Sequence, residues 1–289
     1  KLIMYISLLS IFLSCASGLK NNIVKREFSK LTSYDKLVDF LDEAENKSDL
    51  IEKEFFAVSS EGRKIPVVKI SSDNFTNAKK LKILIFAQQH GNEQSGKEGA
   101  ILLINELLKP ENQYLFDKID LALVPQMNPD GSEVNRRRNG NNMDLNRNHL
   151  ILTEPETIGL HKLFNKYFFE VSMDVHEYSP YGKTWKKYGY RANNDEEIGI
   201  LTNINVSSKI RELSNKTYLP YIKKYLNDRH FSYFEYCPGG PPEIEYIRHS
   251  TFDINDGRQS FGIQNTFSFI QEGLNGEDNF SDNIKHRAE

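Results

Sequence analysis

Strongly apolar segments alternate along the chain with stretches whose apolar residues recur at helical spacing. The apolar segments are Leu81–Ala87, Ile119–Val124, Phe168–Val175 and Phe261–Ile270. The helical patterns between them lie at Gly96–Leu108, Glu156–Tyr167 and Ile198–Asn227. Short runs that are apolar at nearly every position are typical of strands buried on both faces of a parallel or mixed sheet. The alternation therefore predicts an α/β protein: a single domain in which a twisted mixed β-sheet is flanked by helices on both faces.

Two further elements are expected before the first apolar segment. Tyr34–Leu50 carries apolar residues at helical spacing, which predicts a helix. Glu52–Ile70 alternates between apolar and polar positions, and Ser59-Ser60-Glu61-Gly62 within it has the composition of a turn. This segment therefore predicts two paired strands.

The first residues of the chain have the pattern of an export signal. Leu2–Leu13 is almost wholly apolar, and small residues follow it as far as Gly18. A run of this length is too short to span a bilayer and suits the core of a signal peptide, although a buried N-terminal helix is the alternative. Phe12-Leu13-Ser14-Cys15 also resembles a bacterial lipoprotein cleavage site. We expect residues 1–15 to be a signal peptide, with a lipoprotein-type anchor at Cys15 as an open alternative.

Export would place the protein in the periplasm, outside the cell, or on a bacterial membrane through a lipid at Cys15. The only other cysteine is Cys237. If Cys15 is lipidated or removed, no intramolecular disulfide can form, and the hydrophobic core must supply the stability.

Composition narrows the classes of partner. The 289 residues have a formal net charge of −3, with 38% hydrophobic and 27% charged residues. These values are ordinary for one globular domain and give no general attraction to nucleic acid or anionic membranes. The sequence says nothing about the oligomeric state.

Polar side chains follow the apolar segments at the points where strands would end. His90 and Glu93 follow the first segment, Asn128–Asp130 the second, His176 the third and Glu272 the fourth. In sheets of this kind, ligand sites gather at the carboxyl ends of the strands. We therefore expect these side chains to meet at one edge of the sheet.

His90, Glu93 and His176 have the chemistry of a zinc site. Imidazole nitrogens and a carboxylate oxygen are good zinc ligands, and three protein ligands leave a fourth position open, as catalytic zinc requires. Taken singly, each residue has a simpler explanation. His90 and Glu93 would then lie in a helix-capping loop, and His176 would be a hydrogen-bonded core histidine. Together they predict one Zn²⁺ per chain.

Two further groups complete a hydrolytic site. Glu272, held at the end of a strand, is placed to act as general base toward a zinc-activated water, although strand-end glutamates are often merely solvated. The loop Gly131–Asn148 carries four arginines and no aromatic residue, which argues against nucleic-acid binding. Guanidinium groups are instead suited to binding a carboxylate and to stabilising an oxyanion.

The ordered set of these motifs resembles the zinc carboxypeptidase family, the carboxypeptidase A-like metallopeptidases. The resemblance runs from about Phe28 to Gly273. It rests on the following motifs: Ser60-Glu61-Gly62-Arg63, His90-x-x-Glu93, Asn128-Pro129-Asp130-Gly131, Asp144-Leu145-Asn146-Arg147-Asn148, Asp174-Val175-His176-Glu177-Tyr178, and Gly262-Ile263-Gln264-Asn265 through Glu272. It implies a catalytic domain over residues 28–289 that hydrolyses the last peptide bond of a peptide or protein.

The resemblance also implies roles for particular residues. His90, Glu93 and His176 would bind zinc, and Glu272 would be the general base. Asn146 and Arg147 would bind the terminal carboxylate of the substrate. Arg137 would polarise the scissile carbonyl, with Arg138 as the competing choice, and Tyr246 is a candidate for the tyrosine that closes over the substrate.

Departures from the family pattern leave alternatives open. The segment between Glu93 and His176 is short for the family, which implies trimmed loops and a more open cleft. The resemblance implies a helix after Glu272 that the printed sequence lacks, so C-terminal truncation is an open alternative. The rival functions are a related zinc amidohydrolase acting on peptidoglycan peptides or N-acyl amino acids, and a non-catalytic peptide-binding lipoprotein. The preferred terminal side chain is not evident from the sequence.

Overall fold

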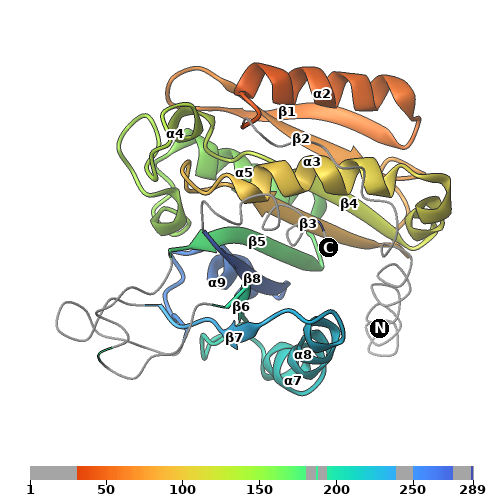
Figure 1. The fold of residues 1–289 in the computed structure, drawn as a ribbon. Helices are drawn as coiled ribbons and strands as arrows, with labels where there is room; N and C mark the ends of the chain where they lie inside the picture. Colours follow the sequence, from red (N-terminus) through yellow and green to blue (C-terminus); the bar gives the residue numbers. More distant parts are fainter. Residues whose placement is uncertain (1–30, 180–186, 188–193, 239–249, 276–287, 289) are drawn as a thin grey trace.

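An eight-stranded mixed sheet runs through the part of the chain that the structure describes (Figure 1). The structure is a computed structural model, and it describes residues 31–179, 187, 194–238, 250–275 and 288. The strands lie in the order β1-β2-β4-β3-β5-β8-β6-β7. Their bounds are β1 Ile51–Val58, β2 Lys64–Ile70, β3 Leu81–Ala87, β4 Ile119–Val124, β5 Val171–Tyr178, β6 Glu196–Gly199, β7 Tyr233–Glu235 and β8 Phe267–Leu274.

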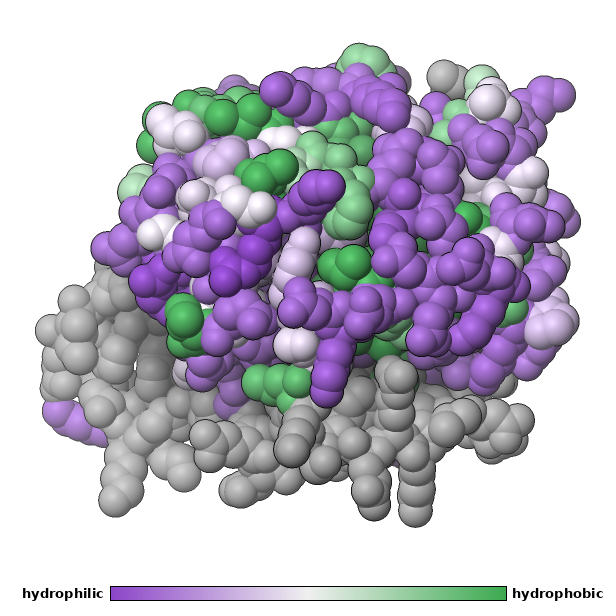
Figure 2. Space-filling model, turned by 90° about the horizontal axis from the view of Figure 1, so that it is seen from above, coloured by the Kyte–Doolittle hydropathy of each residue, from purple (hydrophilic) through white to green (hydrophobic). Residues whose placement is uncertain are grey.

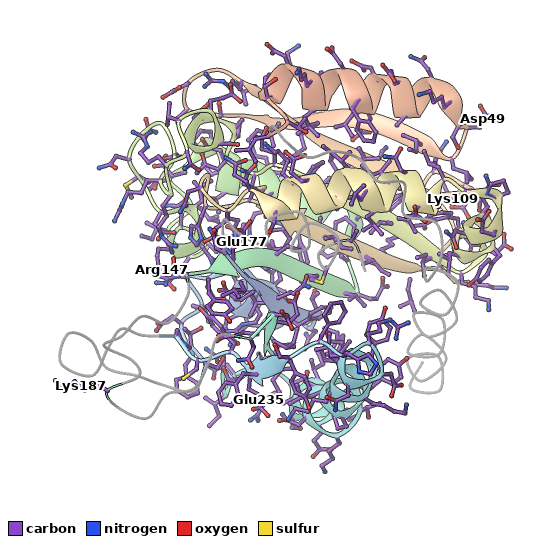
Figure 3. The ribbon with its side chains drawn as sticks, in the orientation of Figure 1. Asp49, Lys109, Arg147, Glu177, Lys187 and Glu235 are labelled. Atoms are coloured by element: carbon purple, nitrogen blue, oxygen red, sulfur yellow. The ribbon has the colours of Figure 1, made fainter. Side chains whose placement is uncertain are left out.

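The centre of the sheet is parallel and its flanks contain antiparallel pairs. Strands β4, β3, β5 and β8 run in the same direction, whereas β1 pairs antiparallel with β2, β2 with β4, and β6 with β8. Since the four central strands are parallel, their carboxyl ends lie at one edge. Figure 3 shows Arg147 and Glu177 on this side of the molecule, and Asp49 and Lys109 on the opposite side.

Helices cover both faces of the sheet (Figure 1). The α-helices are α2 Tyr34–Lys47, α3 Ser95–Leu107, α4 Pro129–Glu133, α5 Pro155–Tyr167, α7 Ser208–Leu213, α8 Leu219–Asp228 and α9 Gly257–Gly262. A π-helical segment, Ser214–Tyr218, joins α7 to α8, and two 3-10 helices lie at Pro110–Asp117 and Leu145–Arg147. One hydrophobic cluster joins the sheet to α2, α3 and α8, and a second joins its other face to α5 and α9. The predicted fold is therefore confirmed.

Most of the predicted elements occur where the sequence pattern places them. The strands at Leu81–Ala87 and Ile119–Val124 are confirmed, as are the strand pair before them and the helix that begins at Tyr34. Helices α3 and α5 match their predictions to within one residue at each end. The strand predicted at Phe168–Val175 lies three residues further along the chain, because β5 begins at Val171 and continues through His176 to Tyr178.

Two predicted elements are wrong in part. The run Phe261–Ile270 begins in helix α9, and only Phe267 onward is strand. The side chain of Asp256 caps this helix by accepting a hydrogen bond from the Gln259 amide, and Asn265 then turns the chain with a φ of 68°. The predicted helix at Ile198–Asn227 begins only at Ser208, because Ile198 pairs with Gln271 in the sheet. Short apolar runs do not distinguish strand from helix, and the pairing decides.

The predicted signal peptide, residues 1–15, lies outside the described residues. No helix among those described is long and apolar enough to cross a membrane. Seen from the side of α2, the surface is mainly hydrophilic, with smaller hydrophobic areas between the polar ones (Figure 2).

Asp130 joins two of the sequence motifs that contain no metal ligand. It is 1% exposed, and its carboxylate accepts hydrogen bonds from the Ser59 and Ser60 hydroxyls at 2.8 and 3.1 Å and from the Glu61 amide at 2.9 Å. Arg63 donates to it at 2.7 Å. The turn between β1 and β2 is thereby attached to the loop that follows β4, which gives Ser60-Glu61-Gly62-Arg63 and Asn128-Pro129-Asp130-Gly131 a structural role.

Replacement of this buried carboxylate should destabilise the fold. We expect Asp130→Ala to lower the free energy of unfolding by about 3 kcal/mol, because three donors and a partly buried guanidinium lose their partner. Urea denaturation would measure the change. Glu61→Gln is the control, since Glu61 forms a surface ion pair with Arg63 and its loss should cost less than about 1 kcal/mol. Equal stability of Asp130→Ala and the wild type would contradict this account of the motif.

Candidate metal centre and catalytic site

His90, Glu93 and His176 converge at the carboxyl edge of the sheet. The Nδ1 atoms of the two histidines lie 3.1 Å apart. Glu93 Oε1 lies 2.6 Å from His90 Nδ1, and Glu93 Oε2 lies 2.8 Å from His176 Nδ1. All three residues are buried, and one ligand atom from each lies within 4.8 Å of the others.

The loop after β3 holds the first two of these residues in place. Gln88 leaves the strand with a φ of 58°, and His90 and Glu93 follow before α3 begins. Gly91 packs against the loop after β4 so closely that a Cβ atom would lie 2.2 Å from the carbonyl carbon of Gly131. Any side chain at this position would separate the two loops, so Gly91 is required for the close approach.

The outward-facing ring nitrogens of both histidines are paired with carboxylates. His90 Nε2 lies 3.1 Å from Asp144 Oδ1, and His176 Nε2 lies 2.8 Å from Asp174 Oδ1. A carboxylate behind each ring holds the Nε2 proton, so the Nδ1 atoms, which face the shared space, are the ones that would bind a metal. Two imidazoles and one carboxylate with an open position form a set that suits catalytic zinc, so the residues present fit this metal.

A chain of buried polar groups extends behind His176. Gln89 Nε2 donates to both oxygens of Asp174 at 2.9 Å, and Gln89 Oε1 lies 2.7 Å from His149 Nε2. His149 Nδ1 in turn lies 3.1 Å from His161 Nε2. Burial lowers the pKa of His149 well below its usual value and that of His161 to about 4, so both rings are neutral near pH 7. This series of hydrogen-bonded side chains therefore holds the Asp174 carboxylate in place, and Asp174 orients the His176 ring.

Glu272 lies beside this cluster on the neighbouring strand. In the parallel pairing of β5 and β8 it stands opposite His176, and it is 8% exposed. Burial raises the pKa of Glu272 from 4.5 to about 8, the nearby charge of His176 opposes the shift, and the charges of Glu93, Glu197 and Asp174 add to it. A carboxyl group with a pKa near neutrality is suited to taking up and returning a proton.

The arginine-rich loop contributes one guanidinium to the cluster. Arg137 Nη1 lies 3.6 Å from Glu93 Oε1, and Arg137 Nε donates to Asp144 Oδ2 at 3.1 Å. Arg138 instead donates to the carbonyl oxygen of Asn142. Arg137 is therefore the one of the two that faces the metal ligands.

The two residues expected to bind the substrate carboxylate differ in exposure. Asn146 is buried: its Nδ2 lies 3.1 Å from His176 Nε2, and its Oδ1 accepts a hydrogen bond from the Gly257 amide at 2.9 Å. Arg147 is exposed, and its Nη1 donates to the carbonyl oxygen of Asn146 at 2.7 Å. Tyr246, the candidate closing tyrosine, lies outside the described residues.

The residues that support the ligands were not predicted from the sequence. Asp174 stands two positions before His176, so both side chains lie on one face of β5, and a charged residue within an apolar strand was the available signal. Gln89 and His149 have no such signal, because they meet only in the fold. Tyr236 was not predicted either; the charge of Glu272 adds to the rise in the pKa of its hydroxyl that burial causes.

Comparison with known proteins places the chain in a family. A model of the family described as zinc carboxypeptidase matches residues 37–233, and the chain belongs to this family. The predicted resemblance is therefore confirmed, as is zinc as the metal that goes with the His-Glu-His site. Carboxypeptidase 2 of Trichophyton rubrum is 27% identical over 225 residues, which cover 74% of this chain and 41% of that protein. Carboxypeptidase D of Mus musculus is 31% identical over 166 residues, which cover 50% of this chain and 12% of that protein.

Solved structures share the fold. A metallo-carboxypeptidase from Burkholderia cenocepacia superimposes with a TM-score of 0.68 at 15% identity and covers 89% of this chain and 66% of its own. A metallo-carboxypeptidase from Pseudomonas aeruginosa, in complex with (2-guanidinoethylmercapto)succinic acid, has a TM-score of 0.67 at 20% identity. The superposition covers 89% of this chain and 66% of that protein. The chain spans about two fifths of the length of the fungal relatives it matches, 41% in the case above.

The carboxylate behind His176 should govern zinc affinity. We expect Asp174→Asn to raise the zinc dissociation constant about 10- to 100-fold, because the neutral amide holds the His176 Nε2 proton less strongly. Competition with a chromophoric chelator would measure the constant. Asp120→Asn is the matched control: Asp120 is also buried on a strand, but it binds Ser71 and Lys80 and should leave the constant unchanged. Wild-type affinity in Asp174→Asn would contradict the role of this pair.

The raised pKa of Glu272 predicts how the stability of the metal-free protein varies with pH. The fold favours the neutral carboxyl group, so its contribution is complete below pH about 4.3 and is lost as the pH rises through about 8. Glu272→Gln cannot ionise. Metal-free Glu272→Gln should therefore gain stability relative to the metal-free wild type between pH 5 and pH 9, as measured by urea denaturation. A difference between the two proteins that does not change with pH would show that Glu272 is not shifted.

Proposed function

We propose that this chain is a zinc-dependent metallocarboxypeptidase that hydrolyses the last peptide bond of a peptide or protein. The observation that carries the proposal is the buried His90-Glu93-His176 cluster with Glu272 on the adjacent strand and Arg137 facing Glu93. A zinc ion in such a three-ligand site polarises a carbonyl group and lowers the pKa of water to about 7.

Glu272 is proposed to be the general base. It removes a proton from the attacking water as the new carbon–oxygen bond forms, and then returns this proton to the leaving amine as the carbon–nitrogen bond breaks. Its position supports this role, because it is buried and stands opposite His176 in the pairing of β5 and β8, beside the residues that would hold the metal.

The arginine-rich loop is proposed to hold the negative charges of the substrate. Arg137 would stabilise the oxyanion that develops on the scissile carbonyl, since Asp144 fixes its guanidinium beside the metal ligands. Arg147, with Asn146, would bind the terminal carboxylate, and the exposure of Arg147 leaves it accessible to a substrate.

We also propose that residues 28–289 form the catalytic domain and that the protein is exported. The apolar run Leu2–Leu13 with the small residues after it supports a signal peptide, and Cys15 supports a lipid anchor.

Removal of the proposed base should abolish hydrolysis without abolishing zinc binding. We expect Glu272→Gln to lower kcat by about 10²- to 10⁴-fold, the range that general-base catalysis contributes. Release of single C-terminal residues from a peptide library would be followed by mass spectrometry, with zinc content measured on the same sample. Glu111→Gln is the control, because Glu111 is an exposed glutamate at the opposite edge of the sheet.

A zinc chelator should also stop the reaction of the wild type, and added zinc should restore it. If the folded, zinc-loaded wild type leaves every peptide intact, the peptidase proposal fails. Peptidoglycan peptides and N-acyl amino acids would then be the substrates to try.

A further inference from the structure

A fully buried guanidinium with unused donors lies on α9. Arg258 is 0% exposed, and its Nη2 donates to the Thr251 hydroxyl at 2.7 Å. Its Nε and Nη1 atoms have no hydrogen-bond partner among the residues that the structure describes. A buried donor without a partner is costly, and an arginine cannot avoid the cost by losing its proton. The site therefore has unsatisfied capacity for an acceptor.

Asp256 lies within ion-pair distance of Arg258 but does not use this capacity. Asp256 Oδ2 lies 3.6 Å from Arg258 Nη2, which is longer than a hydrogen bond. Both oxygens of Asp256 have other partners: Oδ1 accepts from the Gln259 amide at 2.7 Å, and Oδ2 accepts from the Thr251 hydroxyl at 2.6 Å. Asp256 thus caps the helix and leaves Arg258 Nε and Nη1 open.

Register places the guanidinium on the same face of the sheet as Glu272. Gly199 pairs with Ile270, and a Cβ atom on Gly199 would lie 2.3 Å from Arg258 Nη1 and 2.4 Å from Ile270 Cγ2. Since side chains two positions apart share a face of a strand, Ile270 and Glu272 point the same way, about 7 Å apart. Gly199 therefore provides the space that the Arg258 guanidinium occupies.

The carboxylates on this face lie nearer to the metal ligands than Arg258 does. Glu197 pairs with Glu272, whereas Gly199, beside Arg258, pairs with Ile270. The guanidinium therefore lies two residues along the strands from Glu197 and Glu272, on the side away from His176.

Tyr236 connects Arg258 with the proposed substrate groups. The Arg258 guanidinium carbon lies 5.3 Å from the centre of the Tyr236 ring. Burial raises the pKa of the Tyr236 hydroxyl well above its usual value, the charge of Glu272 raises it further, and Arg258 and Arg147 oppose the shift. A Cβ atom on Gly199 would also lie 3.0 Å from Tyr236 Cβ, so Tyr236 and Arg258 pack against the same position of β6, next to the pair formed by Glu197 and Glu272.

We propose that Arg258 forms the floor of the pocket for the side chain of the C-terminal residue and selects an acidic side chain, aspartate or glutamate. This inference rests on the proposed carboxypeptidase function. A side-chain carboxylate would satisfy the open donors with charge-assisted hydrogen bonds, a neutral side chain would leave them unpaired, and a basic one would be repelled. The position also separates two tasks, since Arg147 would bind the α-carboxylate and Arg258 the side-chain carboxylate.

The first test compares two nearly isosteric substrates with the wild type. Peptides that differ only in a terminal Glu or Gln are hydrolysed at neutral pH, and kcat/KM should be at least about 30-fold higher for Glu. Equal values, or a preference for Gln, would overturn the inference while leaving the carboxypeptidase proposal intact.

Variants then assign the preference to Arg258. Arg258→Gln should lower kcat/KM for the Glu peptide at least about 30-fold and change it for the Gln peptide less than about threefold. Arg258→Lys should retain part of the preference because it keeps the charge. Arg229→Gln, a matched loss of charge at the end of α8, should leave the ratio unchanged. An unaltered ratio in a folded Arg258→Gln protein would overturn the assignment.

Two measurements do not depend on whether an Arg258 variant folds. Wild-type enzyme should be inhibited more strongly by (2-carboxyethylmercapto)succinate than by the guanidinoethyl compound that the Pseudomonas aeruginosa protein binds. Calorimetry on zinc-loaded Glu272→Gln should show tighter binding of L-glutamate than of L-glutamine. If no peptide is cleaved but glutamate still binds preferentially, the proposed function fails, whereas the assignment of an anion-binding pocket at Arg258 stands. Indifference to the side chain in both measurements would overturn the pocket.

Discussion

The parallel pairing of β5 with β3 on one side and β8 on the other is the constraint on which the site depends. Residues 83–87 of β3 pair with residues 171–175 of β5, and residues 171–178 of β5 pair with residues 267–274 of β8. The carboxyl ends of these three parallel strands therefore lie at one edge of the sheet. The ligands from the loop after β3, His176 on β5 and Glu272 on β8 meet there because hydrogen-bond register fixes them. A slip of one residue in either pairing would turn His176 or Glu272 to the opposite face.

The charges in the site determine the roles of the side chains that the strand register brings together. The site gathers four carboxylates close to two imidazoles: Glu93 between the rings, Asp144 and Asp174 behind them, and Glu272 beside His176. The carboxylates behind the rings orient them, whereas the burial of Glu272 keeps its carboxyl group neutral until about pH 8 in the absence of metal. The carboxyl groups thus acquire different roles from their different surroundings. The positive charge of a bound zinc ion would offset the negative charge of these carboxylates.

Much of this could be predicted from the sequence because the signals are local. Apolar runs bounded by polar residues located β3 and β4, and the short spacing of His90 and Glu93 made them plausible partners. The signals failed where tertiary contacts decide the outcome. Phe261 is as apolar as a strand residue, yet Asp256 caps a helix around it, and Ile198 becomes a strand residue only because β8 lies beside it. Gln89 and His149 contact each other across 60 residues, and Arg258 acquires its setting from Gly199 and Tyr236, so no pattern along the chain reveals them.

The positions of zinc and substrate in one crystal would test the proposed site directly. Anomalous diffraction at the zinc edge, from crystals of the Glu272→Gln protein with a bound peptide, would locate both. We expect one zinc ion bound by His90, Glu93 and His176, with the last peptide bond beside it and the terminal carboxylate on Arg147. A zinc ion held by other residues, or a peptide that lies with its carboxyl terminus away from Arg147, would contradict the proposed site.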